Sequence, residues 1–207
     1  MTELPTEIAL FTASAAWATQ VVRAVPPFAW DGPGLGGWNL RALVGHTSRA
    51  MLTVEQYLAS RASEEAVASA GEYYERVAEL SGADDAAVLQ RGIAAGELLG
   101  DTPAAEFSAI ADRVTGLLKG VEAEQDPLIS TIAGGIRLSR YLPTRTFELI
   151  VHGLDIARAV GSDAEPPTPC LARALELSID LALRTGRGSD LLMLLTGRTS
   201  SGFSVLP

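Results

Sequence analysis

Apolar residues recur every three or four positions along most of the chain, which is the spacing of amphipathic helices. The pattern predicts a first helix over residues 6–24, ended by prolines, and a second over residues 40–61, for which Asn39 is a suitable N-cap. The Gly/Pro-rich stretch 29–38 between them is predicted to be a loop.

The middle of the chain continues the helical spacing and then changes period. Helices are predicted over residues 72–80 and 84–99, and Pro103 is suited to the first turn of another helix. In residues 126–143, β-branched residues alternate around a pair of glycines. This alternation predicts a short β-hairpin whose two-residue turn is Gly134-Gly135.

The last third of the chain is again helical in pattern. Pro143 is predicted to open a helix that Gly161 ends, because proline suits a first helical turn and glycine a C-terminus. Two further helices are expected over residues 169–184 and 189–196, followed by a final strand at 203–206.

These elements predict an all-α fold. We expect an up-and-down four-helix bundle over residues 1–161, with a short, mainly helical extension over residues 162–207 packed on it. The only strand signal before the C-terminus is the 126–143 stretch, so at most a small β-hairpin is expected beside the helices.

Composition narrows the classes of partner. The 207 residues carry a formal net charge of −9 and no Lys/Arg cluster, which argues against binding to nucleic acid or to anionic membranes. No apolar run reaches the roughly eighteen residues of a membrane span. The single cysteine, Cys170, and an N-terminus unlike a secretory signal indicate a reducing, cytoplasmic location. Small molecules or proteins are the expected partners, and the protein is expected to be a monomer or homodimer.

The predicted helix over residues 145–161 is apolar almost all the way round, yet it carries three potentially charged groups. At 100° per residue, Glu148, His152 and Asp155 share one stripe, which Leu149 and Ile156 flank. An ionised group in an apolar interior costs on the order of several kcal/mol unless it is paired or binds a metal. This stripe therefore requires a partner inside the protein.

A metal ion is one such partner. Glu148 and His152 are four residues apart, so their side chains can converge on one ion, and His46 is the only other histidine in the chain. Two histidines and one carboxylate leave a coordination position open, as in catalytic zinc sites. The alternative is a hydrogen-bonded core network without metal, because the E-x-x-x-H spacing is common in helices.

Two neighbouring residues leave further alternatives open. Asp155 can orient a ligand histidine, but a surface ion pair with Arg158 is the favoured interpretation. Arg145, one turn before Glu148, is a candidate for binding a cofactor or substrate carboxylate, and its alternative role is a salt bridge at the rim.

Three stretches, WNLRALVGHTSRA, RTFELIVHGLDIARAVG and LLTGR, resemble the mycothiol-dependent maleylpyruvate isomerase family, within the DinB-like superfamily of metal-binding four-helix bundles. The resemblance implies that His46, Glu148 and His152 bind one divalent ion, usually taken as zinc. The isomerases of that family carry a separate C-terminal α/β domain, whereas about forty-five residues follow Gly161 here. Because of this difference, the resemblance does not identify maleylpyruvate itself as the substrate.

The resemblance also implies a chemistry. Mycothiol, or a similar low-molecular-weight thiol, is expected to be activated by the ion as a thiolate and to attack a small electrophilic substrate. The outcome is either transfer of sulfur to the substrate or a reversible adduct that permits cis/trans isomerisation. Two other classes stay open: a non-catalytic metal-binding sensor or interaction module, and a metal-assisted hydrolase with water in the open position.

Overall fold

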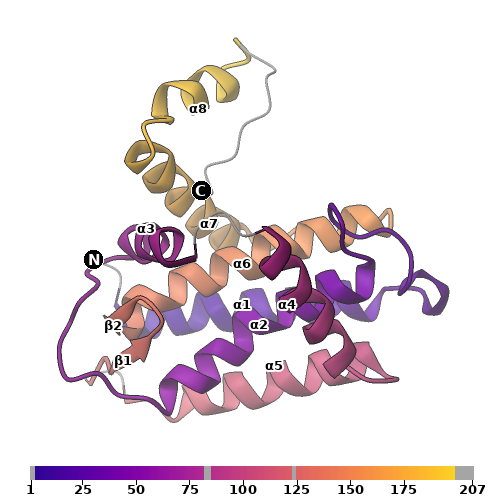
Figure 1. Cartoon of the computed structure of the whole chain (residues 1–207), viewed down its shortest axis with the longest axis horizontal. Coiled ribbons are helices and arrows are strands. Elements are labelled where there is room, and N and C mark those ends of the chain that lie inside the picture. The colour runs from indigo at the N-terminus through magenta and orange to yellow at the C-terminus, as the bar shows by residue number, and fades with distance from the viewer. Residues whose placement is uncertain (1–2, 82–84, 123–124, 199–207) are drawn as a thin grey trace.

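The computed structural model describes residues 3–81, 85–122 and 125–198, and within them it confirms the all-α prediction (Figure 1). The helices are α1 (Leu4–Arg23), α2 (Leu40–Leu58), α3 (Ala70–Ser81), α4 (Asp85–Leu98), α5 (Pro103–Lys119), α6 (Leu138–Ala159), α7 (Thr168–Arg184) and α8 (Gly188–Leu195), with a short 3-10 turn at Pro27–Ala29. One antiparallel hairpin joins β1 (Leu128–Thr131) to β2 (Gly134–Arg137). The predicted strand at 203–206 lies outside the described residues.

Helices α1, α2, α5 and α6 form a four-helix bundle, in which α1 and α2 each pack against both α5 and α6. Two contacts show that α2 and α5 run in the same direction. Arg41, at the start of α2, donates a hydrogen bond to the carbonyl of Gly100, just before α5, and Arg113 pairs with Glu55 near the ends of the two helices. The chain can return for this parallel arrangement because α3 and α4 lie between them.

The other two bundle helices also run parallel to each other. Gly153 of α6 is in close contact with Trp17 of α1, each in the second half of its helix. Tyr141, near the start of α6, donates a hydrogen bond of 2.9 Å to Thr53 near the end of α2, so α6 runs antiparallel to α2. The helix directions along the chain are therefore up, down, down, up. The alternating order expected of an up-and-down bundle is not found, because α3 and α4 return the chain between α2 and α5.

Helix α6 begins earlier than predicted. Its first residue is Leu138, and Pro143 lies inside the helix, so the prediction that Pro143 opens it is wrong. The start is stabilised from outside, because the Asp126 carboxylate accepts hydrogen bonds from the backbone N–H and the hydroxyl of Ser139, at 2.9 and 2.7 Å. Because its first turn is capped in this way, the helix tolerates the loss of the one backbone hydrogen bond that Pro143 cannot donate.

The hairpin is present, but its turn is displaced from the predicted position. Thr131 pairs with Gly134, so residues 132–133 form the turn and the prediction of a Gly134-Gly135 turn is wrong. Gly135 serves another purpose: a Cβ atom there would lie 2.0 Å from the backbone oxygen of Glu64. The glycine is thus required by a neighbouring segment that packs across β2, which local sequence cannot reveal.

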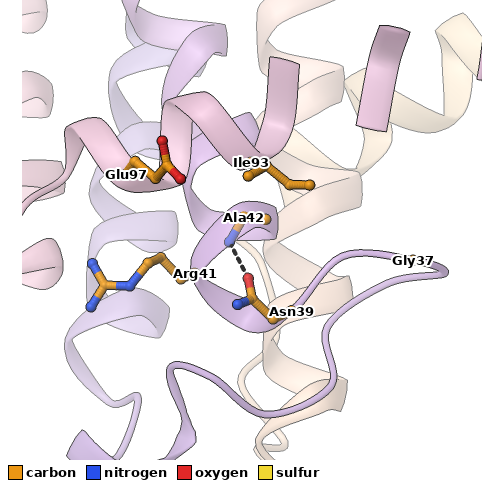
Figure 2. Close-up of a pocket in the computed structure, with 6 residues that line it drawn as sticks. All are labelled: Gly37, Asn39, Arg41, Ala42, Ile93 and Glu97. Carbon is orange, nitrogen blue, oxygen red and sulfur yellow. Dashed lines mark hydrogen bonds between the residues drawn. The ribbon is translucent and has the colours of Figure 1, made fainter. Parts of the chain in front are cut away.

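The N-terminus of α2 and the C-terminus of α6 follow the predicted capping chemistry. The side chain of Asn39 accepts a hydrogen bond of 2.9 Å from the backbone N–H of Ala42 at the start of α2 (Figure 2). After α6, Gly161 has a φ of 67° and the N–H of Ser162 donates to the carbonyl of Ala157, as in a Schellman motif.

The remaining helices cover the bundle. Helix α4 lies against α2 so closely that a Cβ atom on Gly45 would be 2.1 Å from the backbone nitrogen of Gly96. Helix α7 packs on α6 and α1, where the fully buried Glu7 pairs with Arg173 at 3.0 Å, and α8 packs against α7. In the described part of the chain, no helix is both long enough and apolar enough to cross a membrane.

Candidate metal centre

The antiparallel contact between α2 and α6 brings the three candidate ligands together. His46 comes from the first half of α2, and Glu148 and His152 lie one turn apart on α6. One potential ligand atom from each residue lies within 4.8 Å of those of the other two. The two imidazole rings meet edge to face, with centroids 4.9 Å apart. Residues more than a hundred positions apart thus form one compact group of donors.

The His152 ring is fixed at both nitrogen atoms. Its Nδ1 lies 3.2 Å from the Asp155 carboxylate, and its Nε2 lies 3.2 Å from Glu148. Burial opposes protonation of the ring, but the two carboxylates outweigh it and raise the pKa of His152 to about 9. The prediction of a surface ion pair between Asp155 and Arg158 is wrong, because the Asp155 carboxylate faces His152.

Glu148 is held by a residue that the sequence analysis did not single out. The hydroxyl of Tyr74, on α3, donates a hydrogen bond of 2.5 Å to the carboxylate. Burial alone would raise the pKa of Glu148, yet His152, Arg145 and Tyr74 together lower it to about 2. The carboxylate is therefore ionised at neutral pH. The sequence offers one signal for Tyr74: a tyrosine on a buried helix face needs a hydrogen-bond partner for its hydroxyl.

His46 has the opposite electrostatic environment. Burial and the neighbouring His152 lower the pKa of His46 to about 4, so the ring is neutral at pH 7 and keeps a lone pair to donate. Its Nδ1 atom is buried and has no hydrogen-bond partner among the described residues. The ring of Trp38 packs on it, with centroids 4.5 Å apart.

These residues fit a divalent metal ion. Two imidazoles and a carboxylate match the preferences of zinc, and a carboxylate on the far nitrogen of a ligand histidine is the usual supporting arrangement. The core-network alternative satisfies Glu148 and His152 but leaves a buried nitrogen of His46 without a partner. Because buried polar atoms are almost always satisfied, the orphaned nitrogen favours a bound ion over a purely structural network.

A cavity of about 420 Å³ is lined by two of the three candidate donors, His46 and Glu148. Arg145 lines it, with its guanidinium 5.1 Å from the ring centre of Tyr141 and 5.6 Å from that of Tyr73. None of the described carboxylates forms a salt bridge with Arg145. The alternative role predicted for this arginine, a salt bridge at the rim, is therefore not found among the described residues. The arginine instead faces the cavity beside Glu148.

A separate cavity of about 320 Å³ lies at the start of α2 (Figure 2). Its lining residues are Gly37, Asn39, Arg41, Ala42, Ile93 and Glu97, none of which belongs to the three donors. Asn39 uses its side-chain oxygen to cap the helix, and Arg41 binds the carbonyl of Gly100. The groups available for chemistry are thus concentrated in the larger cavity.

Comparison with known proteins gives one match. A family model described as the mycothiol maleylpyruvate isomerase N-terminal domain matches residues 10–157, a span that runs from α1 into α6 and includes all three donors. No curated protein and no solved structure matches the chain. Because the family model covers well over half of the sequence, the chain belongs to the mycothiol maleylpyruvate isomerase N-terminal domain family.

Proposed function

We propose that this protein is a metal-dependent thiol transferase or isomerase that uses mycothiol, or a similar low-molecular-weight thiol, against a small electrophilic substrate. The observation that carries the proposal is the convergence of His46, Glu148 and His152 beside a cavity, with a buried nitrogen of His46 left unpartnered. Family membership supports the choice of thiol.

A divalent ion at this site, which we propose to be zinc, would supply the positive charge that favours a thiolate over a thiol near neutral pH. His46 and His152 would donate neutral nitrogens, and Glu148 a carboxylate oxygen. Asp155 holds the His152 ring so that Nε2 faces the other donors, and Tyr74 holds Glu148.

The residues around the donors define what the second substrate meets. Val77 and Val88 line the cavity and limit the access of water, while Arg145 would contact a bound cosubstrate or substrate. Addition of the thiolate to one carbon of a polarised double bond would form a carbon–sulfur bond and break the π bond, and the electron pair left on the rest of the substrate would take up a proton. At a saturated carbon that carries a leaving group, as in monochlorobimane, the thiolate would instead displace that group, which leaves as chloride. If the adduct is stable the outcome is S-transfer. If the sulfur leaves again after rotation about the former double bond, the outcome is cis/trans isomerisation.

We further propose that residues 1–161 form the metal-binding unit and that residues 162–207 cover it from one side. The packing of α7 on α6 supports this division. A cytoplasmic location remains a prediction, as does the choice between monomer and homodimer.

Two other functions use the same site differently. A metal-assisted hydrolase would hold water in place of the thiol, and a sensor or interaction module would bind the ion without turnover. The cavity beside the donors favours a reaction with a small molecule over a sensor.

Turnover assays with and without thiol separate these functions. The zinc-loaded protein is incubated with maleylpyruvate, or with monochlorobimane as a general thiol acceptor, in the presence and absence of mycothiol. We expect consumption of an electrophile only when the thiol is present, and loss of that activity in His46→Ala. Thiol-independent consumption would indicate a hydrolase, and a loaded protein without turnover on either probe would favour the sensor. Glu165→Gln, a change in the loop before α7, is the matched control.

A further inference from the structure

The side chain of Trp38 contacts both a candidate metal ligand and a neighbouring helix. Its ring packs on the His46 imidazole, with centroids 4.5 Å apart and an angle of 32° between the ring planes. Its indole N–H donates a hydrogen bond of 2.9 Å to the backbone carbonyl of Leu89 in α4. One side chain thus joins a donor of the metal centre to a helix that supplies none of the three donors.

The backbone of Trp38 is itself held in place. The residue directly precedes Asn39, the N-cap of α2 (Figure 2). Its N–H donates a hydrogen bond to the carbonyl of Leu35, and its carbonyl accepts one from the N–H of Gly34, at 2.9 and 3.0 Å. Because both backbone groups are bonded, the loop holds the ring at a defined position beside His46.

The α4 backbone also approaches the Trp38 ring closely. A Cβ atom on Gly92, which is buried, would lie 2.5 Å from both Cε2 and Nε1 of that ring. No side chain larger than hydrogen fits at this position without a shift of the ring or of α4. The indole is therefore in contact with α4 as well as with His46.

Helix α4 buries few apolar side chains of its own. In its described part, Ala95 is the one apolar residue that is buried. The helix approaches α2 instead through its backbone, since a Cβ atom on Gly45 would be 2.1 Å from the nitrogen of Gly96. Little apolar burial means little hydrophobic stabilisation, and segments of this kind open locally at low free energy. The contacts with Trp38 are thus a substantial part of what holds α4 in place.

Helix α4 also forms part of the wall of the larger cavity. Val88 and Arg91 line this cavity together with His46 and Glu148. Leu89, whose carbonyl binds the indole, directly follows Val88 in the chain. A displacement of α4 would therefore move both the cavity wall and the ring that packs on His46.

We propose that Trp38 is a positioning residue of the metal centre. Its ring fixes the His46 imidazole, and its bond to α4 ties that ligand to the cavity wall. Because coupling between two sites is reciprocal, ion binding at His46 stabilises α4, and displacement of α4 weakens ion binding. The inference rests on the proposed function only in that His46 binds an ion, and it does not involve the thiol. The alternative is that Trp38 contributes to packing alone.

Zinc affinity tests the contact between the ring and His46. Competition with a chromophoric chelator should show a Kd roughly tenfold higher in Trp38→Ala, as for other residues that orient a metal ligand. Trp38→Phe keeps an aromatic face beside His46 and should bind zinc more tightly than Trp38→Ala. The control is Trp30→Ala, because the Trp30 ring lies near Arg41 instead. An unchanged Kd in Trp38→Ala, or an equal loss in both Trp38 variants, would overturn the role of the ring.

Two measurements distinguish positioning from a general loss of stability. Val114→Ala leaves a cavity in the core at a fully buried residue of α5 that does not line the metal cavity. We expect it to lower the melting temperature but to leave the zinc Kd unchanged. The visible spectrum of bound Co2+, which depends on coordination geometry, should change in Trp38→Ala and not in Val114→Ala. The same loss of affinity and the same spectrum in both variants would overturn the proposal.

Hydrogen exchange of the full-length protein tests the coupling to α4. Zinc should slow amide exchange in α4 relative to α5, and this slowing should be lost in Trp38→Phe, which has no N–H for the Leu89 carbonyl. Gly92→Ala should raise the zinc Kd by roughly 2- to 30-fold, whereas Gly116→Ala, whose Cβ meets nothing within 4 Å, should not.

The outcomes separate this inference from the proposed function. Exchange in α4 that zinc does not slow, or slows equally in Trp38→Phe, would overturn the coupling even if the wild type binds zinc. An unchanged zinc Kd in Gly92→Ala would do the same. A wild type that binds no zinc would overturn the proposed function and this inference together. Absence of thiol-dependent turnover in a protein that binds zinc would overturn the proposed function alone.

Discussion

The Oδ2 atom of Asp155 lies 3.2 Å from Nδ1 of His152, and this contact turns the other ring nitrogen of His152 toward Glu148. The carboxylate thus selects the tautomer and the orientation that a metal ligand needs. An aspartate three residues after a histidine on one helix achieves this without any contribution from another element.

Removing the Asp155 carboxylate should weaken metal binding without abolishing it. In Asp155→Ala we expect the Kd for zinc to rise by roughly 10- to 100-fold, the usual cost of losing the carboxylate behind a ligand histidine. Competition with a chromophoric chelator measures the change. Asp163→Ala, in the loop after α6, serves as the control. An unchanged Kd in Asp155→Ala would show that this contact does not support the site.

Much of this arrangement could be predicted from the sequence, because it depends on local periodicity. Helical spacing places Glu148 and His152 on one face, and Asn39 and Gly161 mark helix ends through their own backbone chemistry. The orientation of Asp155 was missed, since spacing alone does not decide whether a stripe at the edge of a helix faces inward.

The other differences come from contacts between distant segments. The start of α6 depends on the Asp126 carboxylate, and Gly135 of the hairpin depends on the backbone of Glu64, about seventy residues earlier. Tyr74 reaches Glu148 from α3, and Arg91 reaches the cavity from α4. A single sequence does not show which residues of two distant segments lie side by side, so neither Tyr74 nor Arg91 could be assigned to the site.

Tyr74 should contribute to the site through its hydroxyl alone. In Tyr74→Phe the ring remains and the hydrogen bond to Glu148 is lost, so we expect metal affinity to fall by roughly 10- to 100-fold, consistent with the ~1.5–3 kcal/mol of one hydrogen bond to a charged group. Tyr57→Phe removes a hydroxyl from the same cavity and is the control. The account of Tyr74 would be wrong if both variants bound zinc as the wild type does.

Metal binding should depend on pH through His152. Its pKa of about 9 means that the ring is protonated at pH 7 in the metal-free protein, whereas His46, with a pKa of about 4, is already neutral. Binding should therefore release one proton, and affinity should rise about tenfold per pH unit up to about pH 9. Titrations in buffers of different ionisation enthalpy count the protons; a count of zero at pH 7 would contradict this assignment.

The same group makes the metal-free protein less stable at alkaline pH. Because the pKa of His152 is raised from 6.5 to about 9 by folding, its contribution to stability is complete below pH 6.5 and is lost as pH rises through 9. Urea denaturation of the metal-free protein between pH 6 and 10 measures this loss. His152→Ala should remove that component of the pH dependence, and its persistence in the variant would assign it to another group.

Close packing of α4 on α2 should be sensitive to a single methyl group. Gly45→Ala would place a Cβ atom 2.1 Å from the Gly96 nitrogen, so α4 must shift, and we expect a loss of ~1–3 kcal/mol in the free energy of unfolding. Gly116→Ala is the matched control, since a Cβ atom in α5 meets nothing within 4 Å and should stabilise the helix by ~0.5–1 kcal/mol. Equal stability of Gly45→Ala and wild type would contradict the packing.

The central claim is that His46, Glu148 and His152 hold one metal ion, and elemental analysis of the protein as purified tests it most directly. We predict about one divalent ion per chain in the wild type, and its loss on dialysis from His46→Ala and from His152→Ala. Circular dichroism confirms that each variant is folded. A folded wild type without metal even after incubation with zinc, or a metal content unchanged in both variants, would contradict the claim.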